Sequence, residues 1–241
     1  MKLGSLFSGS GGFELAGALF GIEPVWSSEI EPFCLRVEAA RFPGCKQVGS
    51  VTDIRGDELE PVDIITFGSP CQDLSVAGKQ AGIHDGERSN LFFEAIRIIK
   101  EMRHATANKY PRFGVWENVP GAFSSNKGED FRAVLKAFCS VRDDTCDVPR
   151  PEGGKWEPAG CVLGEDFSIA WRTYDAQYWG VPQRRRRIYL VADFAGGRAG
   201  EILFERESVQ WDSETGREAW ERASRYVAGG TGGSGRPRWL L

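Results

Sequence analysis

Strand-like and helix-like patterns alternate along most of this 241-residue chain. Apolar residues at helical spacing follow the early β-branched or aromatic runs, which is typical of a parallel sheet whose strands are joined by helices. The expected strands are 2–7, 25–28, 64–67 and 113–116, and the expected helices are 13–20, 32–41, 91–102 and 131–138. Two later strands, 169–176 and 188–192, are expected to form an antiparallel edge. The pattern predicts an α/β fold with helices on both faces of the sheet.

The composition is that of an ordinary globular protein, with 41% hydrophobic and 27% charged residues. No apolar run approaches the roughly 18 residues of a membrane helix, and the N-terminus lacks the apolar region of a signal peptide, so we expect a cytoplasmic protein. Six scattered cysteines and two histidines predict free thiols and no metal site. With a net charge of −4, any nucleic-acid contact depends on local positive clusters, of which Arg184–Arg187 stands out.

One segment places a thiol just beyond the end of an expected buried strand. Ile64–Phe67 is β-branched or aromatic, Gly68 ends the run, and Cys71 follows within Pro70-Cys71-Gln72. Ligands of open α/β sheets bind outside the carboxyl ends of the strands, so Cys71 is a candidate nucleophile. Taken alone, such a cysteine is more often a small buried residue that closes a strand.

A loop of small residues, Phe7–Gly12, lies between the first expected strand and the first expected helix. A ligand can approach its backbone and the free N–H groups of the helix start, although Glu14 replaces the third glycine of a dinucleotide-binding fingerprint. Glu29 follows the second strand, 18 residues after Gly11. An acid at that distance can accept hydrogen bonds from ribose hydroxyls. The alternatives are a simple tight turn and a surface carboxylate.

Two further features belong with Cys71. Glu117 follows the strand 113–116 and so faces the same edge of the sheet, where a carboxylic acid can donate a proton to a substrate. The arginine run leads into a strand, so Arg185 and Arg187 share one side and can bring positive charge that activates a thiol. An isolated run of this kind is otherwise a solvated basic patch.

Together these features resemble the DNA cytosine methyltransferases that modify carbon 5, of bacterial and phage type. The resemblance covers about residues 1–194 and rests on four motifs in the family's order. They are Phe-Ser-Gly-x-Gly-Gly at 7–12, Pro-Cys-Gln at 70–72, Glu-Asn-Val at 117–119 and Gln-x-Arg-x-Arg at 183–187. The resemblance implies a Rossmann-like, S-adenosylmethionine-dependent methyltransferase fold with a mostly parallel, seven-stranded sheet.

The resemblance also implies a substrate, a cofactor and the roles of individual residues. Cys71 would attack carbon 6 of a cytosine that has left double-stranded DNA, and Glu117 would protonate the ring nitrogen. Arg187 would hold the base carbonyl, and Arg185 would support the thiolate. The segment 73–89 would close over the flipped base. S-adenosylmethionine would be bound by Phe7, Gly9, Gly11, Gly12, Glu29, Ile30, Val51, Pro70 and Leu91, with Glu29 on the ribose.

The chain departs from this family in several places. Gly4-Ser5 stands where many members have an acidic residue, and Ser50 stands where the family commonly has an aspartate. Residues 143–164 are rich in proline, glycine and charge, and are expected to form an exposed insertion. After a catalytic domain of 1–194, residues 195–241 form a glycine-rich tail in place of the family's recognition region and closing segment.

Two alternatives to an active methyltransferase remain at this point. A non-catalytic or split subunit would need a partner chain for DNA recognition, and the short tail is the reason to consider it. A nucleotide-dependent oxidoreductase is disfavoured by the missing third glycine of the fingerprint and by the Pro-Cys-Gln motif.

Overall fold

The computed structural model describes residues 1–70, 91–180, 182–204 and 238–240. The chain divides into two compact units, Met1–Asn118 and Val119–Leu241. None of the helices in the described residues is long and apolar enough to cross a membrane. Within the same residues, no group of three or more His, Cys, Asp or Glu side chains is placed to hold a metal ion.

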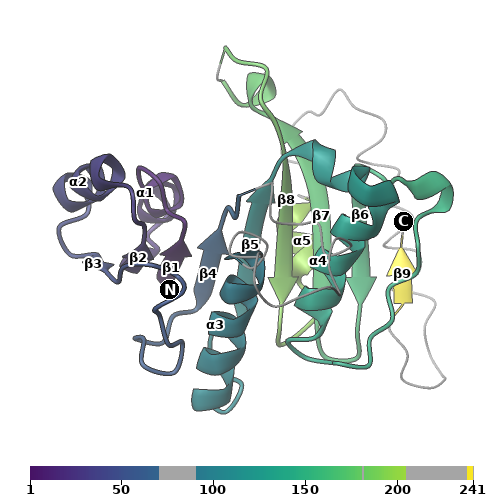
Figure 1. Cartoon of the computed structure of the whole chain (residues 1–241), viewed down its shortest axis with the longest axis horizontal. Coiled ribbons are helices and arrows are strands. Elements are labelled where there is room, and N and C mark those ends of the chain that lie inside the picture. Colours follow the sequence, from purple (N-terminus) through teal and green to yellow (C-terminus); the bar gives the residue numbers. More distant parts are fainter. Residues whose placement is uncertain (71–90, 181, 205–237, 241) are drawn as a thin grey trace, which may run out of the picture. The chain divides into compact units, whose positions relative to one another are not determined.

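The first unit is built on five parallel strands in the order β3-β2-β1-β4-β5 (Figure 1). They are β1 (Lys2–Leu6), β2 (Glu23–Ser28), β3 (Lys46–Gln47), β4 (Ile64–Phe67) and β5 (Phe113–Asn118). The chain leaves β1 toward β2 on one side and later returns to β4 on the other, so the strand order reverses at β1. Such a reversal leaves a crevice at the carboxyl ends of the strands, where ligands of open α/β sheets bind.

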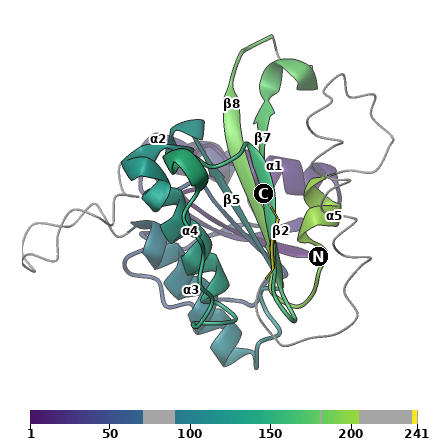
Figure 2. The same cartoon turned by 90° about the vertical axis from the view of Figure 1, so that its right-hand side faces the viewer.

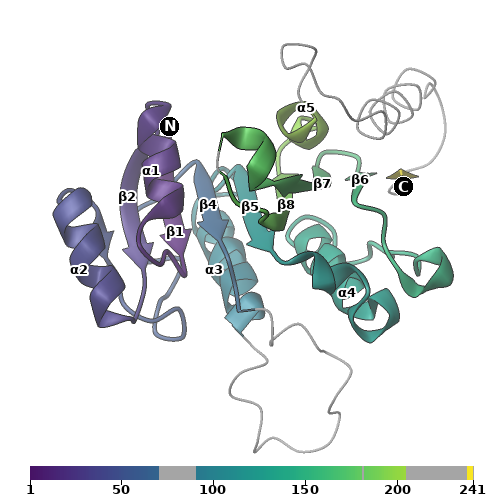
Figure 3. The ribbon, with the colours of Figure 1, turned by 90° about the horizontal axis from the view of Figure 1, so that it is seen from above.

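Helices cover both faces of this parallel sheet. They are α1 (Gly12–Leu19), α2 (Pro32–Arg41) and α3 (Leu91–Ala105) (Figure 3). α1 lies on the face of Leu3, because a Cβ atom at Gly17 would come within 3.1 Å of the Leu3 side chain. Phe92 of α3 lies on the opposite face, where its ring centroid is 6.0 Å from those of both Phe67 and Trp116.

The second unit contains an antiparallel sheet in the order β8-β7-β6-β9. Its strands are β6 (Ala159–Leu163), β7 (Ser168–Asp175), β8 (Arg186–Asp193) and β9 (Arg238–Leu240). Its helices are α4 (Glu129–Cys139) and α5 (Ala199–Leu203), with short 3₁₀ turns η3 (Pro120–Phe123), η4 (Ser125–Gly128), η5 (Glu152–Gly154) and η6 (Ala176–Trp179). An aromatic cluster forms the core, with the Phe131 ring 4.8 Å from Phe123, 5.7 Å from Trp156 and 5.5 Å from Trp171.

Most of the predicted elements are confirmed. The helix at 32–41 has the predicted bounds, and the two late strands pair antiparallel, from Ser168 opposite Asp193 to Asp175 opposite Arg186. The described residues contain nine strands, where the resemblance implied seven. The sequence pattern missed three of the nine, namely the two-residue β3, β6 and the three-residue β9. The predicted division of the chain at residue 194 stays a prediction.

The expected exposed insertion at 143–164 is confirmed only in part, because exposed and buried residues alternate along the segment. Trp156 and Val148 are 1% and 0% exposed, and the segment ends in strand β6, where Cys161 and Val162 are buried. Glycine, proline and charged residues dominate the local composition, but the Trp156 ring packs against Phe131. Burial here depends on that distant partner, which local composition does not reveal.

Candidate active site

The loop between β1 and α1 has a backbone that brings its amides to the sheet edge. Phe7, Gly9 and Gly11 have positive φ angles of 53°, 59° and 84°. A Cβ atom at Gly11 would lie 2.6 Å from the Phe42 ring, so both conformation and packing require glycine there. At Gly9 and Gly12 a Cβ atom would meet no described atom within 4 Å. The space beside these two residues is therefore open to a ligand.

Glu29 connects the end of β2 to this loop. One of its carboxylate oxygens accepts a hydrogen bond from the Gly9 N–H at 2.8 Å. The other accepts from the N–H groups of Ile30 and Glu31, at 2.7 and 2.9 Å. The structure thus brings together the glycine loop and the acid that the sequence predicted for one ligand. Contact of Glu29 with a ribose stays a prediction.

The other residues predicted to bind the cofactor differ in exposure. Val51 is buried, whereas the Ile30 side chain is 71% exposed next to Glu29. Pro70 is exposed, and Leu91, the first residue of α3, is half-buried. An exposed isoleucine at a ligand-binding edge offers apolar surface that a planar ring can cover.

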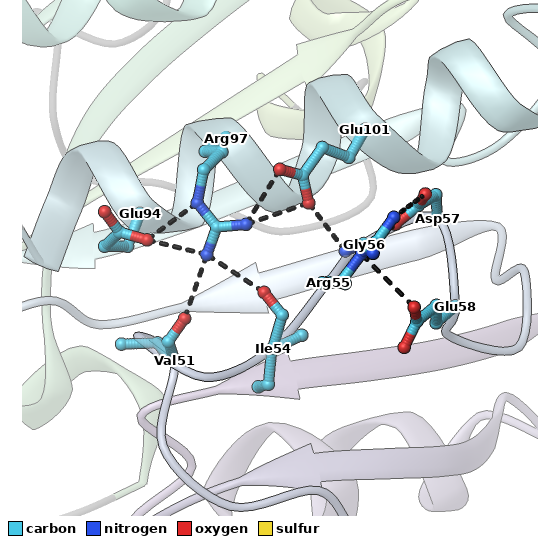
Figure 4. A network of polar contacts seen from close by, with 9 residues as sticks. All are labelled: Val51, Ile54, Arg55, Gly56, Asp57, Glu58, Glu94, Arg97 and Glu101. Atoms are coloured by element: carbon cyan, nitrogen blue, oxygen red, sulfur yellow. Dashed lines mark hydrogen bonds and ion pairs between the residues drawn. The ribbon is translucent and has the colours of Figure 1, made fainter.

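A charged network that the sequence analysis did not identify holds the segment containing Val51. Arg97 of α3 donates hydrogen bonds to the carbonyl oxygens of Val51 and Ile54, at 3.2 and 3.0 Å (Figure 4). Its guanidinium also pairs with Glu94 and Glu101 on the same helix, at 2.6 and 2.8 Å. Burial alone would lower the pKa of Arg97, but the hydrogen bonds to Glu101 and Glu94 raise it overall. From the sequence alone, Glu94, Arg97 and Glu101 would be interpreted as exposed ion pairs along one face of a helix.

Glu117 lies beside the segment that leads to Cys71. β4 and β5 are parallel, and Phe67 pairs with Trp116, so Gly68 and Glu117, which come next along the chain, are neighbours. A Cβ atom at Gly68 would lie 3.3 Å from a carboxylate oxygen of Glu117. Cys71 itself lies outside the described residues, as does the segment 73–89.

Side chains of β5 also fix Ser69, two residues before Cys71. The indole N–H of Trp116 donates to Ser69 Oγ, and the Asn118 amide donates to the Ser69 carbonyl oxygen, both at 3.2 Å. Ser69 and Asn118 are both buried. Neither residue was predicted from the sequence to have a role, although Asn118 belongs to the Glu-Asn-Val motif.

A buried polar cluster lies beneath the glycine loop. Ser27, Ser5 and Thr66 are register partners on β2, β1 and β4 and share one face of the sheet. Glu38 of α2 accepts a hydrogen bond from Ser27 at 2.9 Å. Glu14 of α1 is 1% exposed, and neither of its carboxylate oxygens has a hydrogen-bond partner among the described residues. Burial raises the pKa of Glu14 to about 7, and the charge of Glu38 adds to the effect.

Arg185 and Arg187 belong to the second unit and lie next to the turn between β7 and β8. The Arg185 backbone N–H donates to Asp175 Oδ1 at 3.1 Å, and the Arg187 guanidinium donates to the Arg186 carbonyl oxygen at 2.9 Å. The predicted roles of Arg185 on the Cys71 thiolate and of Arg187 on the base carbonyl stay predictions.

Solved methyltransferase structures share this fold. A candidate DNA modification methyltransferase encoded within an E. coli prophage matches with a TM-score of 0.60 at 20% identity, over 87% of this chain and 52% of that one. The S. pombe Dnmt2 methyltransferase matches with a TM-score of 0.59 at 17% identity, over 89% of this chain and 58% of that one. The fold is therefore that of the Rossmann-like methyltransferases, as predicted.

The family follows from the sequence comparison. The pattern of the C-5 cytosine-specific DNA methylases matches residues 1–142, and the chain belongs to that family. The resemblance inferred from the four motifs is confirmed.

Individual relatives are much longer than this chain. It is 33% identical to a DNA N-6-adenine-methyltransferase of Escherichia phage P1, over 96% of this chain and 34% of the relative. It is 35% identical to the type II methyltransferase M2.BsuMI of Bacillus subtilis, over 80% of this chain and 42% of the relative. It is 30% identical to the type II methyltransferase M.HhaI of Haemophilus parahaemolyticus, over 77% of this chain and 47% of the relative. The chain spans between a third and a half of the length of these curated relatives.

Proposed function

We propose that this chain transfers a methyl group from S-adenosylmethionine to carbon 5 of a cytosine in double-stranded DNA. The observation that carries the proposal is the Glu117 carboxylate beside Gly68, at the start of the segment that continues to Cys71. An acid and a thiol at one sheet edge are the pair that carbon-5 chemistry needs. Membership of the cytosine-specific family supports the same reaction.

Carbon 5 of cytosine is a poor nucleophile, so the base must be activated before it can accept a methyl group. In the proposed reaction the Cys71 sulfur bonds to carbon 6 while Glu117 donates a proton to ring nitrogen 3, which makes carbon 5 electron-rich. S-adenosylmethionine, when bound, supplies the electrophilic methyl group. After methylation the proton on carbon 5 leaves to solvent, the bond between Cys71 and carbon 6 breaks, and the ring nitrogen returns its proton.

The two arginines are proposed to act through their charge. A thiol with an ordinary pKa of about 8.5 is only a few per cent ionised at neutral pH, so Arg185 near Cys71 would increase the thiolate fraction. Arg187 would donate a hydrogen bond to the carbonyl oxygen of the base. The target base must leave the duplex for these contacts, which costs a few kcal/mol.

The residues at the carboxyl ends of the strands in the first unit are suited to bind S-adenosylmethionine. Open space beside Gly9 and Gly12 admits a ligand to the loop backbone. Glu29 offers acceptor oxygens to ribose hydroxyls, and Ile30 offers exposed apolar surface to the adenine. The proposed pocket is completed by Phe7, Gly11, Val51, Pro70 and Leu91.

Adenine methylation is the second candidate, because the phage P1 relative is named for it. About two thirds of that relative lies outside the match, so its name need not describe the matched part. The exocyclic nitrogen of adenine can attack a methyl donor without a covalent enzyme adduct. A Pro-Cys-Gln thiol therefore favours cytosine as the substrate.

DNA containing 5-fluorocytosine tests the proposed reaction. Fluorine cannot leave carbon 5 as a proton does, so the covalent adduct is trapped. We expect the native chain with S-adenosylmethionine, and with any partner chain that DNA recognition requires, to form a stable protein–DNA adduct that Cys71→Ala does not form. Cys34→Ala, which removes a thiol on α2, should keep the adduct. An adduct that persists in Cys71→Ala would rule out this nucleophile, and N6-methyladenine in unmodified DNA would favour the second candidate.

The relatives' greater length suggests that sequence recognition needs more polypeptide than this chain. We propose that a recognition region, continuous with this chain or on a partner chain, selects the target cytosine. Base-edge contacts specify a DNA sequence, whereas phosphate contacts only position the protein. A regulatory subunit that binds cofactor or DNA without turnover is the corresponding non-catalytic alternative, and the 5-fluorocytosine trap separates the two.

A further inference from the structure

The hairpin formed by β7 and β8 carries more positive charge and aromatic surface than the proposed chemistry uses. Figures 1 and 2 show this hairpin projecting from the rest of its unit. We call its projecting part, residues 172–189, the arginine arm. In a chain with a net charge of −4, the arm contains five arginines and one acidic residue. The arginines are Arg172 and Arg184–Arg187, and the aromatic residues are Tyr174, Tyr178, Trp179 and Tyr189.

Arg184 and Arg186 are not neutralised within the arm. Both are exposed, and neither forms an ion pair with an acidic side chain in the described part of the chain. Asp175 lies opposite Arg186 in the strand register. Its carboxylate instead accepts hydrogen bonds from the Gln177 N–H, the Gln177 side chain and the Arg185 N–H, at 3.3, 3.0 and 3.1 Å. The acid therefore shapes the turn, and the two guanidinium groups remain available to a partner.

Packed rings give the arm a defined shape. The Arg172 guanidinium lies over the Tyr174 ring at 5.2 Å, and that ring is 5.5 Å from Trp179 and 5.8 Å from Tyr189. The Tyr174 hydroxyl donates to the Leu203 carbonyl oxygen at 2.5 Å, which ties the arm to α5. The arm is thus organised before any partner binds.

Tyr178 lies outside this packing. Its side chain is 76% exposed at the turn. An aromatic ring held at the tip of a basic element is suited to stack on a nucleic-acid base, since every base has a planar face.

We propose that the arginine arm binds DNA beside the target base, with Arg184 and Arg186 on backbone phosphates and Tyr178 stacked on the base that has lost its pairing partner. The inference rests on the proposed function, in which DNA is the substrate. Guanidinium groups suit phosphates because their planar donors match the phosphate oxygens in pairs. Contacts of this kind position the protein without reading sequence.

The salt dependence of DNA binding tests the phosphate contacts. Each neutralised phosphate contributes about 0.9 to the slope of log affinity against log salt, so Arg184→Gln/Arg186→Gln should lower that slope by about 1.8. The affinity gap between native chain and variant should then shrink about tenfold between roughly 50 and 200 mM salt. The probe is a labelled mixed-sequence duplex, read by fluorescence anisotropy. Arg55→Gln/Arg198→Gln removes the same charge from exposed sites elsewhere and should leave the slope unchanged. Equal slopes for the native chain and the arm variant would overturn the proposal.

A duplex with one abasic site, which leaves a base without its partner, tests Tyr178. The native chain should bind it more tightly than the fully paired duplex. Tyr178→Ala should lose that preference, and Tyr178→Phe should keep it because stacking needs the ring and not the hydroxyl. The stacking contact would be overturned if Tyr178→Ala still preferred the abasic duplex, or if the native chain showed no such preference.

These measurements are independent of methyl transfer. A native chain that shows the arm-dependent slope but forms no adduct with 5-fluorocytosine DNA, even when the recognition region of a relative is supplied, would refute the proposed reaction and keep the arm. If the native chain forms the adduct but the arm variant has the same salt slope as the native chain, the proposed reaction is kept and the arm proposal is refuted.

Discussion

Glu14 introduces a pH dependence into the stability of the folded chain. Its pKa is raised from 4.5 to about 7 in the folded state, mainly by burial. As pH rises through this range, the unfolded chain ionises first, so stability present below pH 4.5 is lost by about pH 7. At 1.36 kcal/mol per pKa unit the loss amounts to about 3 kcal/mol.

Substitution of this acid gives a clear expectation. Glu14→Gln should remove this loss of stability with rising pH. The free energy of unfolding of the variant should therefore increase steadily, relative to that of the native chain, between about pH 4.5 and 7. Urea unfolding followed by circular dichroism at several pH values measures the difference. Glu23→Gln, at an exposed position, is the matched control and should follow the native curve. Parallel curves for Glu14→Gln and the native chain would show that Glu14 does not titrate in this range.

The role of Glu14 could not be predicted from the sequence. The residue is noticeable there only because it replaces a glycine in the fingerprint. Its burial requires Ser5 on β1 and Glu38 on α2 to meet it on one face of the sheet. The cluster also places an acid near Ser5, where the family commonly has an acidic residue on the strand itself.

Among the elements, α3 determines where the segment after Val51 lies. Arg97 donates to two carbonyl oxygens of that segment, and Glu101 accepts from the Gly56 N–H at 2.7 Å. A Cβ atom at Gly56 would lie 2.2 Å from the Ile98 carbonyl oxygen, so the segment also packs directly on the helix backbone. A helix that was predicted only as an amphipathic core element thus supports one wall of the proposed cofactor pocket.

Arg97→Met tests this support. The variant should lose about 1–3 kcal/mol of stability, because the two carbonyl bonds disappear and both glutamates lose their partner. It should also bind S-adenosylmethionine more weakly by calorimetry, since Val51 is no longer held. Arg55→Met is the control in the same region, because Arg55 forms only exposed pairs with Asp57 and Glu58. Its stability should stay within about 0.5 kcal/mol of the native value. Equal losses in the two variants would contradict the supporting role of Arg97.

Elements with strong periodicity were predictable, and those that depend on distant partners were not. Pro32 at the start of α2 and the β-branched run of β4 both specify their structure locally. β6 has no such local pattern, because its short apolar run follows prolines and glycines and becomes a strand by pairing with β7 and β9. The contacts that fix Ser69 share this property, since they arise from the pairing of β4 with β5.

For the chain as a whole, the proposed chemistry draws on motifs from both units. The glycine loop, Glu29 and Glu117 lie in Met1–Asn118, whereas Arg185 and Arg187 lie in Val119–Leu241. The order of these motifs along the sequence was enough to predict the family. Only a fold that brings the strand ends together can supply the distances between Glu29 and Gly9 and between Glu117 and Gly68.

The 241-residue chain should bind DNA without sequence preference and methylate it poorly. Its cationic surface in the arginine arm suits phosphates, and phosphate contacts carry no sequence information. Fusing the recognition region of a relative beyond Gly235, or supplying it in trans, should raise methyl transfer from labelled S-adenosylmethionine and confine it to particular sites. The readouts are the label incorporated into a mixed-sequence duplex and the positions of 5-methylcytosine after sequencing. The same fusion carrying Cys71→Ala is the control and should transfer no label. Strong, site-specific methylation by the 241-residue chain alone would refute the prediction, and would mean that residues 195–241 themselves read the DNA sequence.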